Sequence, residues 1–275
     1  MTKPKIIVVC GPTATGKTSY AIKLAKKIGG EVISADSRQV YTGINLLSGK
    51  ATKKEMAGIP HYLLDITSAK KQFSVADFQK LGKQAIENIL SRGKTPIICG
   101  GTGLYIDALV YDTVLPEVKP NKELRAKLVR KSSEELFRTL QKLDPERAKT
   151  IDAKNPVRLI RAIEIAKELG AVPQTSKTTP YDIEWVYLDF PDDTLKQRIH
   201  TRLIERISQG MLREAKKLHE NGVSYKRMNE LGLECRTCAK YLQKKITKNE
   251  LIAELDNDIW HYVKRQRTWF KKFAK

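Results

Sequence analysis

IIVVCGPTATGKTSY, at residues 6–20, joins an apolar run to a glycine-rich turn and the start of a helical pattern. Residues 11–18 fit the pattern GxxxxGK[ST], which binds phosphate groups when it connects a strand to a helix. In such a loop, backbone amides converge on phosphate oxygens, the lysine neutralises their charge and the final hydroxyl ligates Mg²⁺. We therefore predict diphosphate binding, with Thr18 as the Mg²⁺ ligand, by Gly11, Pro12, Thr13, Ala14, Thr15, Gly16, Lys17 and Thr18.

The sequence around this loop alternates short apolar runs with amphipathic stretches. Apolar runs at 5–10, 31–34 and 95–99 predict strands, and the stretches at 17–28 and 76–91 have helical periodicity. The apolar run at 185–190 predicts one further buried strand, which is followed by helical sequence through Leu218. This alternation is typical of an α/β protein with a P-loop NTPase-like parallel sheet flanked by helices.

The pattern changes after Leu115, where two prolines precede a charged stretch of helical periodicity without strand signals. We expect residues 116–180 to form a mainly helical insertion domain that ends in the loop at 170–182. Residues 1–115 and 181–275 then form the catalytic core and a helical C-terminal region.

Charge points to a polyanionic partner. The 275 residues carry a formal net charge of +20, and 41% of them are hydrophobic, which indicates a globular chain and excludes a disordered or fibrous one. A lysine-rich solvated surface is the alternative explanation of the charge. The segment 264–275 favours nucleic acid, because it has no acid and its bases (Lys264, Arg265, Arg267, Lys271, Lys272, Lys275) alternate with Trp269, Phe270 and Phe273.

The chain shows neither an export signal nor an apolar run of the ~20 residues that cross a bilayer, so we expect a cytoplasmic protein. Four cysteines in this length indicate a reducing compartment. Cys10 and Cys99 lie in apolar runs and are expected to pack as small hydrophobes. Cys235 and Cys238 form one CxxC, the half of a zinc site, but no second pair follows.

Three further features suggest chemistry. Asp36 follows the second predicted strand, where ligands gather in parallel sheets, and is a candidate general base; a turn or helix-cap aspartate is the alternative. The turn GGTG at 100–103 could direct its amides and the Thr102 hydroxyl at a phosphate or leaving oxygen. Arg158 and Arg161 share one helix face and could hold a diphosphate, unless that face is merely solvated. Asp189 resembles a magnesium-binding acid, but a structural strand-end residue is the favoured interpretation.

Seven segments follow one another in an order that matches a known family. They are GPTATGKT at 11–18, DSRQVY at 36–41, HYLLDI at 61–66, GGTGLYI at 100–106, NPVRLIRAIE at 155–164, RI at 198–199 with GM at 210–211, and KRQRTWFKK at 264–272. With these segments the chain resembles the tRNA dimethylallyltransferase (tRNA isopentenyltransferase) family from end to end.

The resemblance implies transfer of a dimethylallyl group from its diphosphate to N6 of adenosine-37, next to the anticodon, in tRNAs that read codons beginning with U. It implies a monomer that needs Mg²⁺ and binds the anticodon stem-loop, without a membrane partner. Asp36 would be the base, with Lys17 and Thr102 as further catalytic residues and Arg158 and Arg161 on the diphosphate. The implied tRNA contacts are Asp36, Ser37, Arg38, Gln39, Thr102, Arg125, Val157, Arg158, Leu159, Ile160, Arg161, Lys264, Arg265, Gln266, Arg267, Thr268, Trp269, Phe270 and Lys271.

Two departures from the family pattern affect the expected tRNA contacts. Val157 stands where the family usually has Gln or Arg, and the stretch 229–234 replaces a turn that usually contains a GY pair beside a basic residue. Three other functions stay open at this point. They are an adenylate isopentenyltransferase that acts on free nucleotide, a P-loop nucleotide kinase, and a non-catalytic RNA-binding protein.

Overall fold

The chain forms two units in a computed structural model, which describes residues 2–111, 113, 115–173 and 178–273. Unit 1 comprises residues 1–111 and 179–275, and unit 2 comprises residues 112–178. The insertion domain was expected at 116–180. Residues 174–177 of its expected exit loop, Lys275 and the side chain of Lys272 lie outside the described part of the chain.

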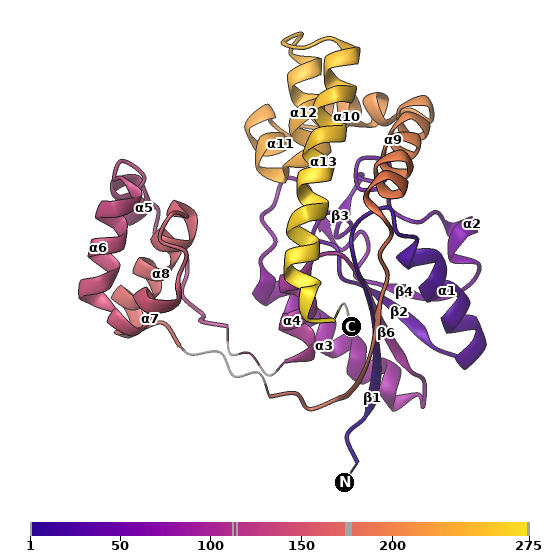
Figure 1. Ribbon diagram of the computed structural model, residues 1–275, viewed down its shortest axis with the longest axis horizontal. Coiled ribbons are helices and arrows are strands. Elements are labelled where there is room, and N and C mark those ends of the chain that lie inside the picture. Colours follow the sequence, from indigo (N-terminus) through magenta and orange to yellow (C-terminus); the bar gives the residue numbers. More distant parts are fainter. Residues whose placement is uncertain (1, 112, 114, 174–177, 274–275) are drawn as a thin grey trace. The chain divides into compact units, whose positions relative to one another are not determined.

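Unit 1 is built on a five-stranded parallel sheet in the order β4-β2-β6-β1-β7 (Figure 1). The sheet strands are β1 (Lys5–Cys10), β2 (Glu31–Ser34), β4 (His61–Tyr62), β6 (Pro96–Gly100) and β7 (Asp182–Tyr187). A separate two-stranded ribbon pairs β3 (Tyr41–Thr42) with β5 (Thr67–Ser68). The predicted α/β class with a parallel P-loop core is confirmed.

Side chains of β1 alternate between two hydrophobic cores, because successive residues of a strand point to opposite faces. Ile7 and Val9 pack against Ala21 and Ala25 of α1 (Lys17–Ile28). Ile6, Val8 and Cys10 belong to the larger core, which also contains buried residues of α3 (Val75–Ser91), α4 (Gly103–Val110) and the C-terminal helices. Helices therefore cover both faces of the sheet.

The C-terminal part of unit 1 is helical, as expected (Figure 1). It consists of α9 (Asp192–Ser208), α10 (Met211–Glu220), α11 (Tyr225–Leu231), α12 (Leu233–Leu242), α13 (Lys248–Phe270) and a 3₁₀ turn at Lys271–Phe273. A short helix, α2 (Lys53–Met56), precedes β4. Both thiols of the CxxC, Cys235 and Cys238, are buried in the apolar core around α12.

Unit 2 consists of α5 (Lys122–Leu128), α6 (Ser133–Leu143), α7 (Pro145–Thr150) and α8 (Pro156–Leu169). Leu136 and Leu140 of α6 pack with Leu159 and Ile163 of α8 in a core of their own. An ion pair links α5 to α8 in this unit. Glu164 is buried and accepts two hydrogen bonds of 2.7 Å from the Arg125 guanidinium.

A buried ion cluster holds the amino-terminal edge of the sheet. Glu31 begins β2, is 1% exposed, and accepts hydrogen bonds from Arg92, Lys94 and Tyr62. The hydrogen bonds from Arg92 are the main cause that lowers the pKa of Glu31 to about 2, with Lys94 and Tyr62 adding to them against burial. This cluster lies at the opposite ends of the strands from the phosphate-binding loop, so its role is structural.

The predicted elements mostly agree with the structure, and β7 is the largest displacement. It was expected at 185–190 but spans Asp182–Tyr187, at the edge of the sheet and only half-buried. Its apolar sequence continues past the last paired residue, which explains the shift. Among the described helices, none has both the length and the apolar character that crossing a bilayer requires.

Candidate functional site

The turn from β1 to α1 has the backbone geometry of a phosphate-binding loop. Gly11 has φ 140° and lies so close to the next strand that a Cβ would stand 2.0 Å from the carbonyl oxygen of Leu188. Gly16 (φ 83°) and the non-glycine Ala14 (φ 62°) also adopt left-handed conformations. The Thr15 hydroxyl donates to the carbonyl oxygen of Pro12 at 2.9 Å and closes the loop from inside. This geometry requires glycine at position 11, where a side chain has no room, and favours it at position 16, where φ is positive.

Lys17 occupies the centre of this loop. Its side chain donates to the carbonyl oxygen of Pro12. Burial lowers the pKa of the Lys17 ammonium to about 8; Asp36 opposes this shift and Arg202 adds to it. A buried ammonium on a loop of backbone amides is suited to an anion that restores its charged form.

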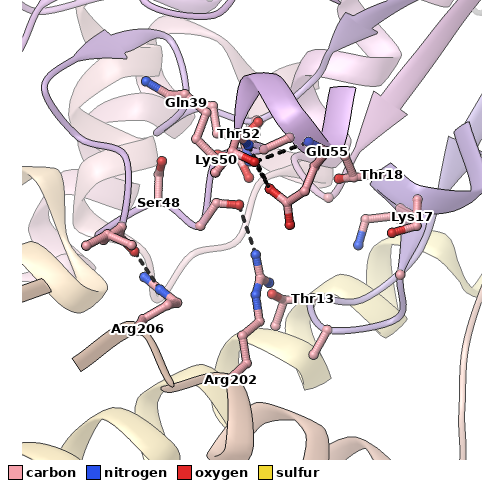
Figure 2. Close-up of a pocket in the computed structure, with 18 of the residues that line it drawn as sticks. Thr13, Lys17, Thr18, Gln39, Ser48, Lys50, Thr52, Glu55, Arg202 and Arg206 are labelled. Carbon is pink, nitrogen blue, oxygen red and sulfur yellow. Dashed lines mark hydrogen bonds between the residues drawn. The ribbon is translucent and has the colours of Figure 1, made fainter. Parts of the chain in front are cut away.

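A cavity of about 1120 Å³ opens beside the loop (Figure 2). Its wall comes from the P-loop, the turn after β2, the segment 45–55, the end of β6, and helices α9 and α13. Lys17 and Thr18 reach it from the P-loop and α1, and Arg202 reaches it from α9 (Figure 2). Asp36 lines the same cavity, so the structure brings the predicted base and the predicted phosphate site together.

Asp36 follows β2 and is fixed by its own turn. Its Oδ1 accepts a hydrogen bond of 2.8 Å from the backbone amide of Arg38. The turn interpretation and the base interpretation therefore both fit, because a turn that fixes the carboxylate also aims it. Gln39 lines the cavity as well and accepts from the Ser34 hydroxyl at 2.9 Å.

Three arginines of α9 line the cavity, and sequence reasoning assigned them no role. Arg198 donates to the carbonyl oxygen of Ala14 at 2.9 Å, and Arg202 donates to that of Gly49 at 2.9 Å. Burial lowers the pKa of Arg202, which still leaves it charged at neutral pH. The spacing of 198, 202 and 206, four residues apart on one predicted helix, was the signal that could have revealed them.

The segment that faces these arginines is held by side chains of the C-terminal helices. Glu214 accepts from the amides of Asn45, Leu46 and Leu47 at 2.9–3.0 Å. Arg206 is buried and donates to the carbonyl oxygens of Leu46 and Leu47. Charge-assisted bonds to both sides of the backbone give this cavity wall a fixed conformation.

The glycines of the GGTG turn have a packing role, and the expectation that the turn binds a phosphate stays a prediction. A Cβ at Gly100 would stand 2.2 Å from the carbonyl oxygen of Ala35, and one at Gly103 would stand 2.2 Å from Cδ1 of Trp269. The Thr102 amide donates to Ala35, and its hydroxyl accepts from the Ser37 amide at 3.1 Å and contacts the Tyr262 hydroxyl. Thr102 therefore fixes the turn that carries Asp36.

The basic segment at the end of α13 divides into exposed and buried side chains. Lys264, Arg265, Thr268 and Lys271 are exposed, and Trp269 is 37% exposed. Gln266 and Phe270 are buried, with Gln266 at the cavity wall, so neither belongs to the exposed side of the segment, and their predicted tRNA contacts stay predictions. Both face the interior because α13 packs one side against the sheet.

Arg267 is also engaged within the protein. It donates to both carboxylate oxygens of Asp189, to Asp192 and to the carbonyl oxygen of Phe190. These bonds raise the pKa of Arg267, with the hydrogen bond to Asp189 as the largest cause. Asp189 is thus a structural residue after β7, as the sequence favoured, and these bonds use four of the five N–H donors of Arg267.

In unit 2, the candidate residues of α8 point in different directions. Leu159 and Ile160 are 0% and 8% exposed in the core of the unit, so their side chains serve packing, and their predicted tRNA contact stays a prediction. Val157 is 75% exposed and Arg158 is exposed. Arg161 donates to the carbonyl oxygen of Val118 at 2.8 Å and lies 3.5 Å from Glu164. The roles of Arg158 and Arg161 toward a diphosphate stay predictions.

The residues of this cavity fit Mg²⁺ only as a partner of a bound phosphate ligand. Thr18 lines the cavity at the start of α1. Among the described residues, no group of three or more His, Cys, Asp or Glu side chains surrounds a common point. Mg²⁺ commonly binds through one or two protein oxygens, waters and the phosphates of the substrate. Thr18 would supply the protein ligand in that arrangement.

Comparisons with known proteins show what the whole chain is similar to. The family model for IPP transferases matches residues 39–273. The tRNA dimethylallyltransferase 2 of Treponema denticola is 43% identical over 279 residues, covering 99% of this chain and 93% of that protein. The tRNA dimethylallyltransferase of Anoxybacillus flavithermus is 38% identical, covering 97% of this chain and 87% of that protein.

Solved structures with similar folds carry related names. The full-length tRNA isopentenylpyrophosphate transferase from Bacillus halodurans is 36% identical with a TM-score of 0.74, covering 99% of this chain and 88% of that one. A eukaryotic dimethylallyltransferase acting on tRNA superposes with a TM-score of 0.82 at 27% identity, covering 97% of this chain and 70% of that one.

Proposed function

Because this chain belongs to the IPP transferase family, we propose that it transfers a dimethylallyl group from dimethylallyl diphosphate to N6 of adenosine-37 in tRNA. The products are N6-(dimethylallyl)adenosine and diphosphate. The observation that carries the proposal is that a phosphate-binding loop and Asp36 line one cavity. One cavity can therefore hold the leaving group and the base that acts on the nucleophile.

The reaction needs a proton acceptor at the attacking nitrogen. N6 forms a bond to C1 of the dimethylallyl group while the bond from C1 to the diphosphate oxygen breaks, and N6 loses one proton. The Asp36 carboxylate takes that proton, and its hydrogen bond from the Arg38 amide supports its orientation. An exocyclic adenine amine is a weak nucleophile, so positioning and stabilisation of the leaving group supply most of the acceleration.

Stabilisation of the departing diphosphate falls to the P-loop and α9. Backbone amides of the loop and the Lys17 ammonium bind the phosphate oxygens, and Arg198 and Arg202 add charge from α9. Thr18 would hold Mg²⁺, which neutralises diphosphate charge when it is bound. Arg158 and Arg161 remain further candidates for this role.

Recognition of tRNA requires that the adenine leave its stack and enter the cavity, because N6 of a stacked base is out of reach of an acid that lines that cavity. We propose that the anticodon stem-loop binds through phosphate contacts of Lys264, Arg265 and Lys271, which are exposed at the end of α13 and on the turn that follows it. The chain acts as a monomer in the cytoplasm, where its RNA substrate is made and used.

The test separates tRNA from free nucleotide as acceptor. Radiolabelled dimethylallyl diphosphate and Mg²⁺ are incubated with unmodified tRNA, with AMP, or with both, and label is counted in each acceptor. We expect label in tRNA alone. Label in AMP would identify an adenylate isopentenyltransferase, and label in neither acceptor would refute the proposal.

A tRNA whose adenosine-37 is replaced by guanosine serves as the matched control. It keeps the backbone and the loop but lacks the N6 amine. Incorporation into this tRNA would show that the acceptor atom is wrong, even if tRNA itself is the substrate.

A further inference from the structure

Gln266 joins two turns of the cavity from a helix that is far away in the sequence. Its Oε1 accepts a hydrogen bond of 2.9 Å from the Thr13 amide, and its Nε2 donates one of 2.9 Å to the carbonyl oxygen of Gly101. The side chain is 5% exposed and lines the cavity. A primary amide offers an acceptor and a donor on one planar group and keeps both at every pH near neutrality.

The contact with Gln266 requires a residue without a side chain at position 101. A Cβ at that position would stand 2.2 Å from Nε2 of Gln266, which is shorter than a non-bonded contact between two heavy atoms can be. Glycine at 101 and glutamine at 266 are therefore complementary across 165 residues of sequence. The GGTG turn was expected to bind a phosphate, and at Gly101 it binds a side chain that reaches the P-loop.

The P-loop needs such a support. Ala14 holds a left-handed backbone, and a non-glycine residue keeps that conformation only where its surroundings enforce it. Two side chains from other elements bond the loop backbone: Gln266 at Thr13 and Arg198 at Ala14. The bond from Arg198 is exposed, whereas the amide of Gln266 is buried.

We infer that Gln266 is a positioning residue that fixes the P-loop against the β6 turn and thereby sets the affinity for the diphosphate of the donor. The inference rests on the proposed function for the identity of that donor. Gln266 touches neither reacting atom, and it acts through Thr13. The residue belongs to the basic segment of α13, yet its effect falls on the diphosphate and not on RNA.

The first test removes both hydrogen bonds and keeps the shape. Gln266→Met should raise the dissociation constant for inorganic pyrophosphate with Mg²⁺ about tenfold, the size of one or two lost buried hydrogen bonds. Calorimetry measures this binding, and a filter assay measures tRNA binding. The tRNA dissociation constant should stay within about twofold of the wild-type value, since Gln266 is buried.

Gln243→Met is the matched control, because Gln243 also donates to a backbone carbonyl, that of Ala239, but does not line the cavity. It should leave pyrophosphate affinity unchanged. An equal loss of pyrophosphate affinity in both variants would overturn the inference, as would unchanged affinity in Gln266→Met.

A second variant keeps the test decisive if Gln266→Met folds poorly. In Gln266→Glu the carboxylate still accepts from Thr13 but cannot donate to Gly101, whereas the protonated acid does both. Its affinity deficit relative to the wild type should therefore shrink as pH falls from 8 to about 5.5. A deficit that does not change with pH would contradict the positioning role.

Pyrophosphate separates this inference from the proposed function. If the wild type binds pyrophosphate but transfers no dimethylallyl group to tRNA, the proposed function fails and the variants still test Gln266. If the Gln266 variants bind pyrophosphate like the wild type while transfer to tRNA proceeds, only the inference fails.

Discussion

Raising the pH from 7 to 9 should weaken binding of dimethylallyl diphosphate through one residue, Lys17. Burial lowers the pKa of its ammonium to about 8 in the free protein. A lysine with a lowered pKa is charged below that value and neutral above it, so the charged form is lost within this pH range. The donor carries negative charge and binds the ammonium form.

The size of the effect follows from that pKa. The charged fraction of Lys17 falls from about nine-tenths at pH 7 to about one-tenth at pH 9, so the apparent affinity should fall by about tenfold over the range. Binding at pH 9 must restore the proton and should take up about 0.9 proton per donor bound. Cys99, the neighbouring thiol, stays protonated here because burial raises its pKa to about 12.

Calorimetry without tRNA measures both quantities, since no acceptor is present and buffers of different ionisation enthalpy report proton uptake. Lys17→Arg is the control, because a guanidinium stays charged throughout this range. Apart from titration of the ligand itself, the donor affinity of this variant should be flat from pH 7 to 9. The variant therefore also measures the contribution of the ligand. A wild-type affinity that is equally flat, without proton uptake, would refute the assignment of Lys17 as a buried ammonium that the diphosphate recharges.

Three other perturbations test separate parts of the protein. Asp36→Asn should lower kcat by at least about 100-fold and leave the tRNA dissociation constant unchanged, because the residue accepts a proton; a smaller loss in single-turnover assays would remove it from the base role. Glu31→Gln should lower Tm at pH 7, and this deficit should disappear between pH 4.5 and 2, where the wild type protonates Glu31; thermal melts across that range decide it. Arg267→Ala should lower Tm because it leaves Asp189 and Asp192 unpaired. The double variant Lys264→Ala with Arg265→Ala should instead lower the slope of log K against log salt for tRNA binding by up to about 1.5. A larger change of this slope in Arg267→Ala than in the double variant would reverse these assignments.

The sequence predicted the phosphate-binding loop well because its determinants are local. Gly11, Gly16 and Lys17 lie within seven residues, and the strand before them and the helix after them have clear periodicities. Asp36 was also identified because the carboxyl ends of parallel strands meet at one edge. Both predictions used residues that directly follow a strand, which the local sequence identifies.

Contacts across the sequence could not be predicted in the same way. Gln266 reaches Thr13 across 253 residues, and Arg198 reaches Ala14 across 184. A glutamine in a basic segment and an arginine on a polar helix both look like surface residues until the helices are packed. The bonds of Arg267 to Asp189 were not foreseen for the same reason, since Asp189 lies 78 residues away.

Helical periodicity explains how one segment carries both a nucleic-acid composition and a structural role. On α13, Tyr262, Gln266 and Phe270 follow one another at intervals of four, and they contact or line the interior of unit 1. The exposed cations at 264 and 265 fall between Tyr262 and Gln266 in the sequence, and the one at 271 directly follows the helix. Composition alone does not distinguish the exposed side chains of this segment from the buried ones, whereas the packing of the helix does. The exposed face is then free to contact RNA while the buried face holds the turns that carry Thr13 and Thr102, so a change on either face should affect one substrate without the other.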